Sequence, residues 1–315
     1  MTLIDAITDR QPNDLESVPC NLCGQDIPKT LFHIGRFRIV ECGGCQLVYT
    51  SPRLRLESLK SIYNQSYFQS PNSLVHGYDD YQKEKPSIQK TFRQRWNRIR
   101  KLSGDRPGRL LDVGCALGYL LDIARCDGWE TKGLDTSQYA VQYARETLQL
   151  DVAHSDLTHL PFPDEHFNVI TLWDVIEHLP DPTRTIRECF QKLKPGGLLS
   201  IITPDQSSLC ARLLGKRWVE YQKPHEHIYF FSTSNFAELL RRIGFHIEWK
   251  GTAGKHVPLG FALERLCSYQ PTVFGALHRL TKTFRIDSIN LKINPGDKMS
   301  LIARRPAGAP TSRVS

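Results

Sequence analysis

Long apolar runs are missing from this sequence. No stretch is long and apolar enough to form a membrane-spanning helix, which needs about 20 predominantly apolar residues. The first residues, Met1 to Ala6, have neither the basic start nor the apolar core of a secretory signal. These absences argue against an integral membrane protein and against a secreted one, so we expect a cytoplasmic protein without a transmembrane segment.

Strong compositional bias is also lacking. Hydrophobic residues make up 40% and charged residues 23% of the 315 residues. These values are ordinary for a soluble globular protein and do not indicate a disordered or fibrous chain. The length exceeds that of one typical domain and is sufficient to bury a sizeable core.

Cysteine, by contrast, is abundant, with nine residues. Four of them form the pairs Cys20-x-x-Cys23 and Cys42-x-x-Cys45, with the spacing of a structural zinc site. Four thiolates fill a tetrahedral zinc shell, so the metal would stabilise the fold and take no part in chemistry. Two structural disulfides would need an oxidising compartment, for which the sequence gives no support. A site that has lost its metal is the third interpretation.

Positive charge is in excess, and much of it is local. The formal net charge is +8, and residues 83–101 include eight basic residues and one acid. Ile88, Phe92, Trp96 and Ile99 recur there at near-helical spacing, which predicts an amphipathic helix with a basic face. That face is either a solvated surface or a contact for phosphate-bearing substrates, membrane headgroups or nucleic acid.

A glycine loop is the most informative feature of the sequence. An apolar, strand-like run ends in Asp112 and continues into small residues at every second position, Gly114, Ala116 and Gly118. Glycine permits a sharp turn, and the helix that opens at Tyr119 presents N–H groups to an anionic part of a nucleotide-like cofactor. Tyr119 replaces the third glycine of the dinucleotide fingerprint, so that motif fits poorly. A tight turn without a ligand is the alternative.

The pattern acidic-x-Gly-x-small-x-Gly resembles motif I of class I S-adenosylmethionine-dependent methyltransferases, with alanine in place of the usual middle glycine. Asp135, about 20 residues further on, ends a second strand and suits a pair of ribose hydroxyls because an ionised carboxylate only accepts hydrogen bonds. Later segments resemble, in family order, the adenine-binding segment, the fourth strand with its loop, and the turn before the fifth strand: 154–157, 167–179 and 193–199. The resemblance implies S-adenosylmethionine as the cofactor and a cofactor site formed by Asp112, Gly114, Ala116, Gly118, Asp135, Asp156 and Trp173.

Strands alternate with helical stretches after residue 105, which predicts an α/β fold with helices on both faces of a parallel sheet. The resemblance adds a Rossmann-like, seven-stranded sheet with an antiparallel last strand. We expect 245–249 and 298–303 to form the final two strands. The residues between them are too many for a bare loop, which predicts a helical insertion that would cap the substrate site.

Five parts follow along the chain. We expect a disordered N-terminus at 1–17, a zinc ribbon at 18–48, an aromatic connector with the basic helix at 49–104, the methyltransferase domain at 105–305 and a disordered tail at 306–315. So small a ribbon buries little surface, and the metal would supply its missing folding energy. The connector is a candidate lid, with Tyr81 over the cofactor. Its alternative role is to pack against the basic helix.

Three histidines are candidates for the base that methyl transfer to a hydroxyl or to a carbon acid requires. His225 and His227 lie in a segment that resembles the His-x-x-x-Phe-Ser segment of bacterial small-molecule and glycan methyltransferases. They would share one side of an extended strand. His178 follows the fourth strand, where ligands bind in such sheets. A structural role is the alternative for all three. Metal binding by the pair is disfavoured, because Glu226 would point away.

These features favour a methyltransferase that acts on a small molecule or a glycan, such as a nucleotide-linked sugar, a lipid-linked saccharide or a secondary metabolite. The basic surface would suit a diphosphate on the acceptor. An RNA methyltransferase that grips the backbone with ribbon and basic helix is an alternative, although aromatics do not alternate with Lys and Arg as in nucleic-acid binders. The third hypothesis is a scaffold that keeps the cofactor fold without catalysis. Peripheral membrane contact and any oligomeric state are compatible with the sequence.

Overall fold

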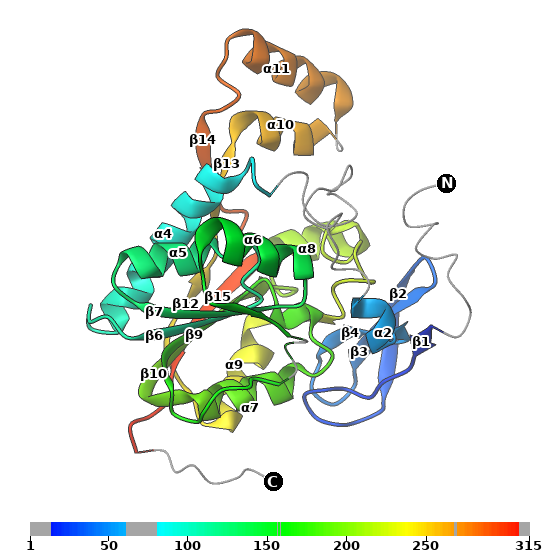
Figure 1. The fold of residues 1–315 in the computed structure, drawn as a ribbon. Helices are drawn as coiled ribbons and strands as arrows, with labels where there is room; N and C mark the ends of the chain where they lie inside the picture. The colour runs from blue at the N-terminus through cyan, green and yellow to red at the C-terminus, as the bar shows by residue number, and fades with distance from the viewer. Residues whose placement is uncertain (1–13, 61–80, 156, 158, 268–269, 309–315) are drawn as a thin grey trace.

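The computed structural model describes residues 14–60, 81–155, 157, 159–267 and 270–308. Figure 1 shows a central sheet between layers of helices, a smaller β-rich part beside it, and a helical hairpin that projects from one end. Within these described residues, no helix combines the length and apolar character needed to cross a membrane.

The central sheet has seven strands in the order β12-β15-β10-β9-β6-β7-β8. Strand β15 is antiparallel to both of its neighbours, whereas the pairs from β10 to β8 are parallel. This arrangement confirms the predicted Rossmann-like fold and its antiparallel last strand. The strands are β6 (Arg109–Val113), β7 (Glu130–Asp135), β8 (Val152–His154), β9 (Phe167–Trp173), β10 (Leu193–Pro204), β12 (His246–Thr252) and β15 (Lys298–Arg304).

Helices cover both faces of this sheet, which explains why β9 and β10 are apolar and buried along most of their length. Trp96, Leu120 and Val141 belong to one hydrophobic cluster, and Ile186 and Phe236 belong to another. Figure 1 shows α4, α5 and α6 above the sheet and α7 and α9 below it. These helices are α4 (Lys85–Leu102), α5 (Tyr119–Cys126), α6 (Gln138–Leu148), α7 (Pro182–Lys192) and α9 (Thr233–Ile243).

The N-terminal ribbon is joined to the main domain. Strands β2 (Pro28–Ile34), β3 (Phe37–Cys42) and β4 (Val48–Thr50) form a sheet whose fourth strand, β11 (Tyr229–Phe230), comes from the core. Ribbon residues and core residues share one hydrophobic cluster. Burial against the core therefore contributes to the stability of the ribbon in addition to any bound metal, which the sequence did not predict.

Part of the segment at each end of the chain lies within the described residues. Strand β1 (Leu15–Glu16) pairs with β5 (Arg53–Leu54), so the N-terminal segment expected to be disordered contains a strand. Helix α2 (Leu56–Lys60) follows. The rest of that segment (1–13), much of the connector (61–80) and most of the tail (309–315) lie outside the described residues.

A helical insertion separates β12 from β15, as predicted. Strands β13 (Lys255–Pro258) and β14 (Asn290–Ile293) pair in antiparallel fashion and form its stem. Helices α10 (Leu259–Cys267) and α11 (Pro271–Thr283) form the projecting hairpin seen at the top of Figure 1. Three short elements complete the fold: η1 (Ile176–His178), α8 (Leu209–Leu214) and η2 (Gly215–Arg217).

Candidate active site

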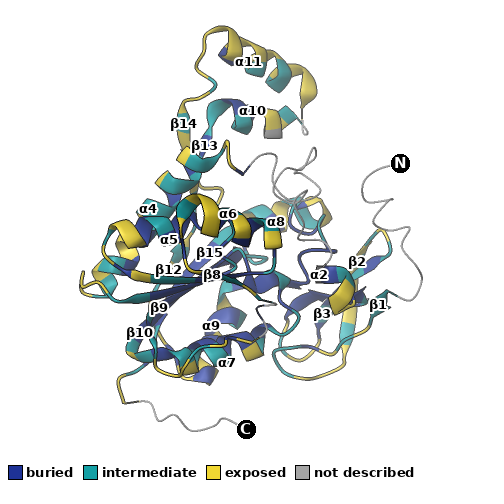
Figure 2. Cartoon of the chain, in the orientation of Figure 1, coloured by how far each residue is buried: buried dark blue, intermediate teal, exposed yellow. Residues whose placement is uncertain are grey.

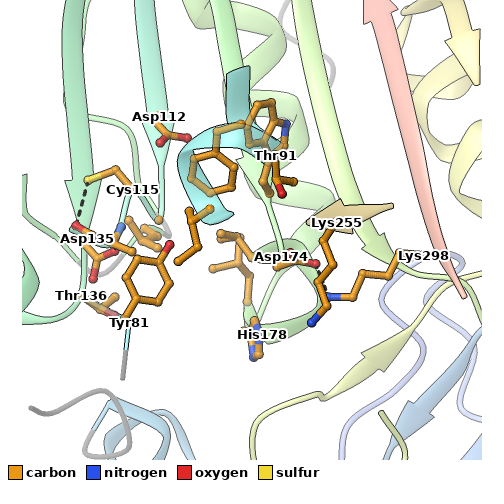
Figure 3. Close-up of a pocket in the computed structure, with 18 of the residues that line it drawn as sticks. Tyr81, Thr91, Asp112, Cys115, Asp135, Thr136, Asp174, His178, Lys255 and Lys298 are labelled. Atoms are coloured by element: carbon orange, nitrogen blue, oxygen red, sulfur yellow. Dashed lines mark hydrogen bonds and ion pairs between the residues drawn. The ribbon is translucent and has the colours of Figure 1, made fainter. Parts of the chain in front are cut away.

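A pocket opens at the carboxyl ends of β6, β7 and β9, the edge where ligands bind in open α/β sheets. Helix α4, strand β13 and the start of β15 complete its walls. Figure 3 shows two distinct ends, with His178 in the lower middle of the view. The carboxylate end holds Asp112 and Asp135, and the cationic end holds Lys255 and Lys298. Arg95 also lines the pocket and lies near enough to Asp174 to lower its pKa, which assigns it to the cationic end.

The glycine loop between β6 and α5 borders the carboxylate end. Gly114 has φ +72°, and a Cβ there would lie 2.4 Å from Val175 Cγ2, so only glycine fits. Ala116 has φ +47°, a conformation that costs about 1–2 kcal/mol for a residue with a Cβ. Gly118, at φ +82°, faces Leu150, which a Cβ would approach to 2.6 Å. Gly118 does not line the pocket. A glycine is needed there because the loop packs closely against Leu150.

Asp135 ties this loop to the second strand of the parallel sheet. Its Oδ2 accepts a hydrogen bond from the Ala116 N–H at 2.7 Å, and its Oδ1 accepts one from the Ser137 N–H at 2.8 Å. Burial raises the pKa of Asp135, and these two hydrogen bonds oppose the rise. The carboxylate lines the pocket and retains lone pairs that can accept from a ribose diol.

Asp112 lies at the end of β6 beside the same loop. It accepts a hydrogen bond from the hydroxyl of Thr171. Burial raises the pKa of Asp112 to about 7, with Thr171 lowering it and the charge of Asp135 raising it further. Near neutral pH the two carboxyls therefore do not both carry a full charge, which limits their mutual repulsion.

Aromatic rings form part of the walls. Trp173 donates its indole N–H to Ser200 Oγ at 3.1 Å and meets Phe92 of α4 edge to face, with 5.2 Å between ring centroids. Tyr81 stacks on Tyr119 at 5.6 Å. Both Trp173 and Tyr81 line the pocket, where their apolar surface excludes water from a bound ligand.

The cationic end is organised around an ion pair. Lys298 Nζ donates to Asp174 Oδ1 at 2.7 Å. Burial would raise the pKa of Asp174, but Lys298 and Arg95 hold it below its ordinary value. Burial would lower the pKa of Lys298, but Asp174, Glu220 and Glu177 together outweigh this and raise it. Both groups are therefore ionised. Together with Lys255, this end has an excess of positive charge among its described lining residues.

His178 lines the pocket in the 3₁₀ turn after β9. Its Nδ1 lies 2.9 Å from the carbonyl oxygen of Glu226, so Nδ1 carries the proton and Nε2 carries the lone pair of the neutral ring. Burial lowers the pKa of His178, although Glu226 opposes the change. At neutral pH the ring is therefore neutral and chemically able to accept a proton.

His225 and His227 are buried beneath His178 and do not line the pocket. The expected extended segment is wrong, because the N–H groups of Glu226 and His227 both donate to the Lys223 carbonyl and close a turn. Glu226 Oε1 lies 3.4 Å from His225 Nε2, so it does not point away from the pair. The ring of His227 packs edge to face on His178 at 4.6 Å, which places His227 as a support for that ring.

A cluster that the sequence did not reveal brings Glu177, His178 and His227 within 4.8 Å of one another. The Glu177 carboxyl is buried and accepts a hydrogen bond from Thr203 Oγ1 at 3.0 Å. Burial raises the pKa of Glu177 to about 8. At neutral pH this carboxyl is therefore largely protonated in the metal-free protein, and we assign no metal to the trio.

The four ribbon cysteines meet at one point, with all sulfurs within 4.8 Å of one another. Cys20 Sγ lies 3.3 Å from Cys45 Sγ, and Cys23 Sγ lies 3.5 Å from Cys42 Sγ. Sulfurs around a tetrahedral zinc ion lie about 3.8 Å apart, so the donor set fits zinc after a small expansion. All nine cysteines are free thiols, which removes the disulfide interpretation.

The pocket joins residues from distant parts of the sequence. Of the residues predicted to bind the cofactor or to act as the base, it brings together Asp112, Gly114, Ala116, Asp135, Trp173, Tyr81 and His178. Asp156 lies outside the described residues. The sequence analysis missed Arg95, Lys255 and Lys298. Lys298 could have been found from topology, because it begins the antiparallel strand opposite Pro204, the last residue of parallel strand β10.

Comparison with known proteins agrees with this geometry. The methyltransferase-domain family matches residues 88–248, about half of the chain. Among curated relatives, a probable S-adenosylmethionine-dependent methyltransferase of Mycolicibacterium smegmatis is 30% identical over 140 residues, which cover 44% of this chain and 52% of the relative. The ubiquinone biosynthesis O-methyltransferase of Aromatoleum aromaticum is 27% identical over 186 residues, which cover 55% of this chain and 79% of the relative.

The chain spans about half or less of the length of the first three curated relatives. Among solved structures, the [4+2]-cyclase SpnF is 23% identical, with 69% of this chain and 82% of that chain covered and a TM-score of 0.49. On the family match, the chain belongs to the methyltransferase-domain family.

Proposed function

We propose that the protein transfers a methyl group from S-adenosylmethionine to the hydroxyl of a small molecule or glycan that carries an anionic group. The observation that carries this proposal is the two-ended pocket, with carboxylates and a glycine loop at one end and cations at the other. One relative supports a hydroxyl as the methyl acceptor, because the Aromatoleum aromaticum protein is named as an O-methyltransferase.

The carboxylate end fits the nucleoside part of the cofactor. Gly114 and Ala116 line the pocket, so the backbone of the glycine loop would lie beside a ligand bound there. Asp135 would accept from the ribose hydroxyls, and the side chains of Leu157 and Tyr81 would border the base. When bound, S-adenosylmethionine supplies a methyl group already activated on a sulfonium. The protein residues then position the acceptor, exclude water and remove a proton.

The cationic end would hold the acceptor. Arg95, Lys255 and Lys298 come from three different elements, and Asp174 pairs with Lys298. The described lining has three more carboxyls: Asp112 and Asp135 at the opposite end, and Glu84 just before α4. Guanidinium and ammonium groups bind phosphate and carboxylate oxygens through charge-assisted hydrogen bonds. In Figure 3, His178 lies between the carboxylate residues on the left and the lysines on the right. A neutral imidazole at this position would take the proton of the acceptor hydroxyl.

Calorimetry with S-adenosylmethionine is the direct test, and we expect one binding site per chain. A labelled methyl group should then pass to a hydroxyl acceptor with a phosphate or diphosphate more readily than to the same acceptor without it. RNA should bind weakly at physiological salt, because backbone contacts weaken steeply as salt rises. Absence of cofactor binding in metal-loaded protein would contradict the proposal and favour a non-catalytic scaffold.

We also propose that the four-cysteine cluster holds structural zinc. Cys42→Ser should reduce the metal content from one per chain to nearly none. It should also lower Tm by on the order of 10 °C, because a structural metal stabilises the folded state. Elemental analysis and thermal unfolding measure both effects. Cys126→Ser, at an exposed cysteine outside the cluster, is the matched control. A metal content that stays near one in Cys42→Ser would refute the four-thiolate site.

A further inference from the structure

Helix α11 carries an apolar stripe on its outer surface. Val273, Leu277, Leu280 and Phe284 recur at intervals of four, three and four residues, and each is between 42% and 69% exposed. At about 100° per residue these positions share one face of the helix. Other exposed apolar residues lie in α10 and in the segment after α11: Leu266, Ile286, Ile289 and Leu291. Contiguous apolar surface of this kind marks an interaction site.

The stripe is distinct from the face that holds the hairpin together. Thr281 is buried, and His278 Nδ1 lies within hydrogen-bond distance of the Gly260 carbonyl at 3.0 Å. These inward positions connect α11 to α10, whereas Figure 2 shows the outer surface of α11 as exposed. A large part of each side chain in the stripe is therefore in contact with water, and this contact is unfavourable in proportion to the exposed apolar area.

The charges within α11 are of one sign, and the hairpin has two acids outside this helix, Glu264 of α10 and Asp287 after α11. Between Pro271 and Ile286 the chain has three cations, Arg279, Lys282 and Arg285, and no acidic residue. All three cations are exposed. A surface that combines apolar side chains with cations matches the boundary of a bilayer that contains anionic lipids, where apolar groups enter the acyl region and cations meet headgroups.

The stem of the hairpin connects this surface to the pocket. Strand β13 supplies Lys255, His256 and Val257 to the pocket lining and leads directly into α10. Strand β13 also packs against α4, whose residues form another pocket wall. A bilayer in contact with the hairpin would therefore lie on the side of the molecule from which the cationic end is built.

We propose that the α10–α11 hairpin docks the protein on an anionic membrane surface through the stripe of α11 and its neighbouring cations. This docking is independent of the proposed methyl transfer. If the protein also transfers a methyl group, docking implies that a lipid holds the acceptor at the membrane, and this second statement rests on the proposed function. The surface needs no spanning helix, since an amphipathic helix can bind in the plane of the interface.

Sedimentation with vesicles tests the apolar contribution. The full-length, metal-loaded protein should bind vesicles of phosphatidylglycerol and phosphatidylcholine and bind weakly to phosphatidylcholine alone. Leu280→Ser combined with Phe284→Ser should lower the partition coefficient by about tenfold or more. Ile27→Ser combined with Leu31→Ser is the matched control, because these side chains are 52% and 40% exposed in the ribbon. It should leave binding unchanged.

Neutral variants test the electrostatic contribution. Arg279→Gln combined with Lys282→Gln should reduce binding to the anionic vesicles by roughly tenfold or more, since each cation near a charged surface contributes several-fold. Arg241→Gln combined with Arg242→Gln removes two exposed cations from α9, on the opposite side of the sheet. This control should bind as the parent protein does.

Each other outcome overturns the docking proposal. Failure to bind anionic vesicles would do so, as would binding that the hairpin variants do not change. A dimer in solution that Leu280→Ser with Phe284→Ser dissociates, without vesicle binding, would assign the stripe to a second copy of the chain. Calorimetry with S-adenosylmethionine on the same variants separates the two proposals, because the hairpin substitutions lie outside the cofactor end and should not change that affinity.

Discussion

Asp135→Asn should weaken the binding of S-adenosylmethionine by about 100-fold, because hydrogen bonds to a charged group contribute about 1.5–3 kcal/mol each. The carboxylate accepts from two backbone N–H groups, those of Ala116 and Ser137. An asparagine offers one oxygen and one NH₂, so one of these donors would face another donor. The substitution would therefore release the glycine loop and remove an acceptor for the ribose at the same time.

Calorimetry and thermal unfolding together check this expectation. Asp151→Asn is the matched control, because Asp151 directly precedes the neighbouring strand β8, is exposed and pairs with Lys132 outside the pocket. The control should bind the cofactor as the parent protein does. Unchanged affinity in Asp135→Asn, with the fold intact, would mean that the nucleoside does not bind at the carboxylate end.

His178→Gln should lower kcat by about 100-fold or more, since a positioned general base contributes roughly 10²–10⁴-fold to the rate. Glutamine retains a side chain that can donate to the Glu226 carbonyl, which His178 Nδ1 contacts at 2.9 Å. It offers no group that takes a proton near neutral pH. Affinity for S-adenosylmethionine should remain within about twofold of the parent value, because the substitution lies outside the carboxylate end.

The pH profile distinguishes a base from a structural side chain. Burial keeps the folded-state pKa of His178 below its ordinary value of 6.5. The neutral base is therefore the major form at pH 6.5 and above, and activity should decline only as pH falls below that value. If His178 is the base, His178→Gln should lose this decline in activity at low pH. If His178 has a purely structural role, the variant should keep the decline.

His256→Gln provides the comparison for that experiment, because His256 also lines the pocket but comes from β13. It should keep most of the parent kcat. A loss in His256→Gln that equals or exceeds the loss in His178→Gln would make His256 the better candidate for the base. Retention of the full rate and of the acidic limb in His178→Gln would exclude proton removal by His178.

Local sequence predicted those parts of the protein in which neighbours along the chain decide the structure. The glycine loop is one example, because Gly114 adopts a positive φ and allows no Cβ beside Val175. The alternation of strands and helices is another example, since the period and the length of the apolar runs that predict each element can be read from neighbouring residues. The metal-ligand spacing of the cysteines also predicted the cluster of four sulfurs.

The histidine segment was misjudged because its conformation depends on a turn. Spacing alone placed His225 and His227 on one side of an extended strand. In the structure, Lys223 accepts two backbone N–H groups and closes a turn that buries both rings. Periodicity could not reveal this, because a turn of a few residues has no repeating pattern.

The sequence by itself determined the family, the sheet, the glycine loop that lines the pocket and the four-cysteine cluster, because each depends on short-range spacing. Only the tertiary structure decided that the ribbon shares the core through β11 and that Lys298 meets Asp174 from the far end of the chain. It also decided that Arg95 and Lys255 close the same pocket. These contacts join residues far apart in sequence, and their geometry follows from how the elements pack rather than from any local pattern.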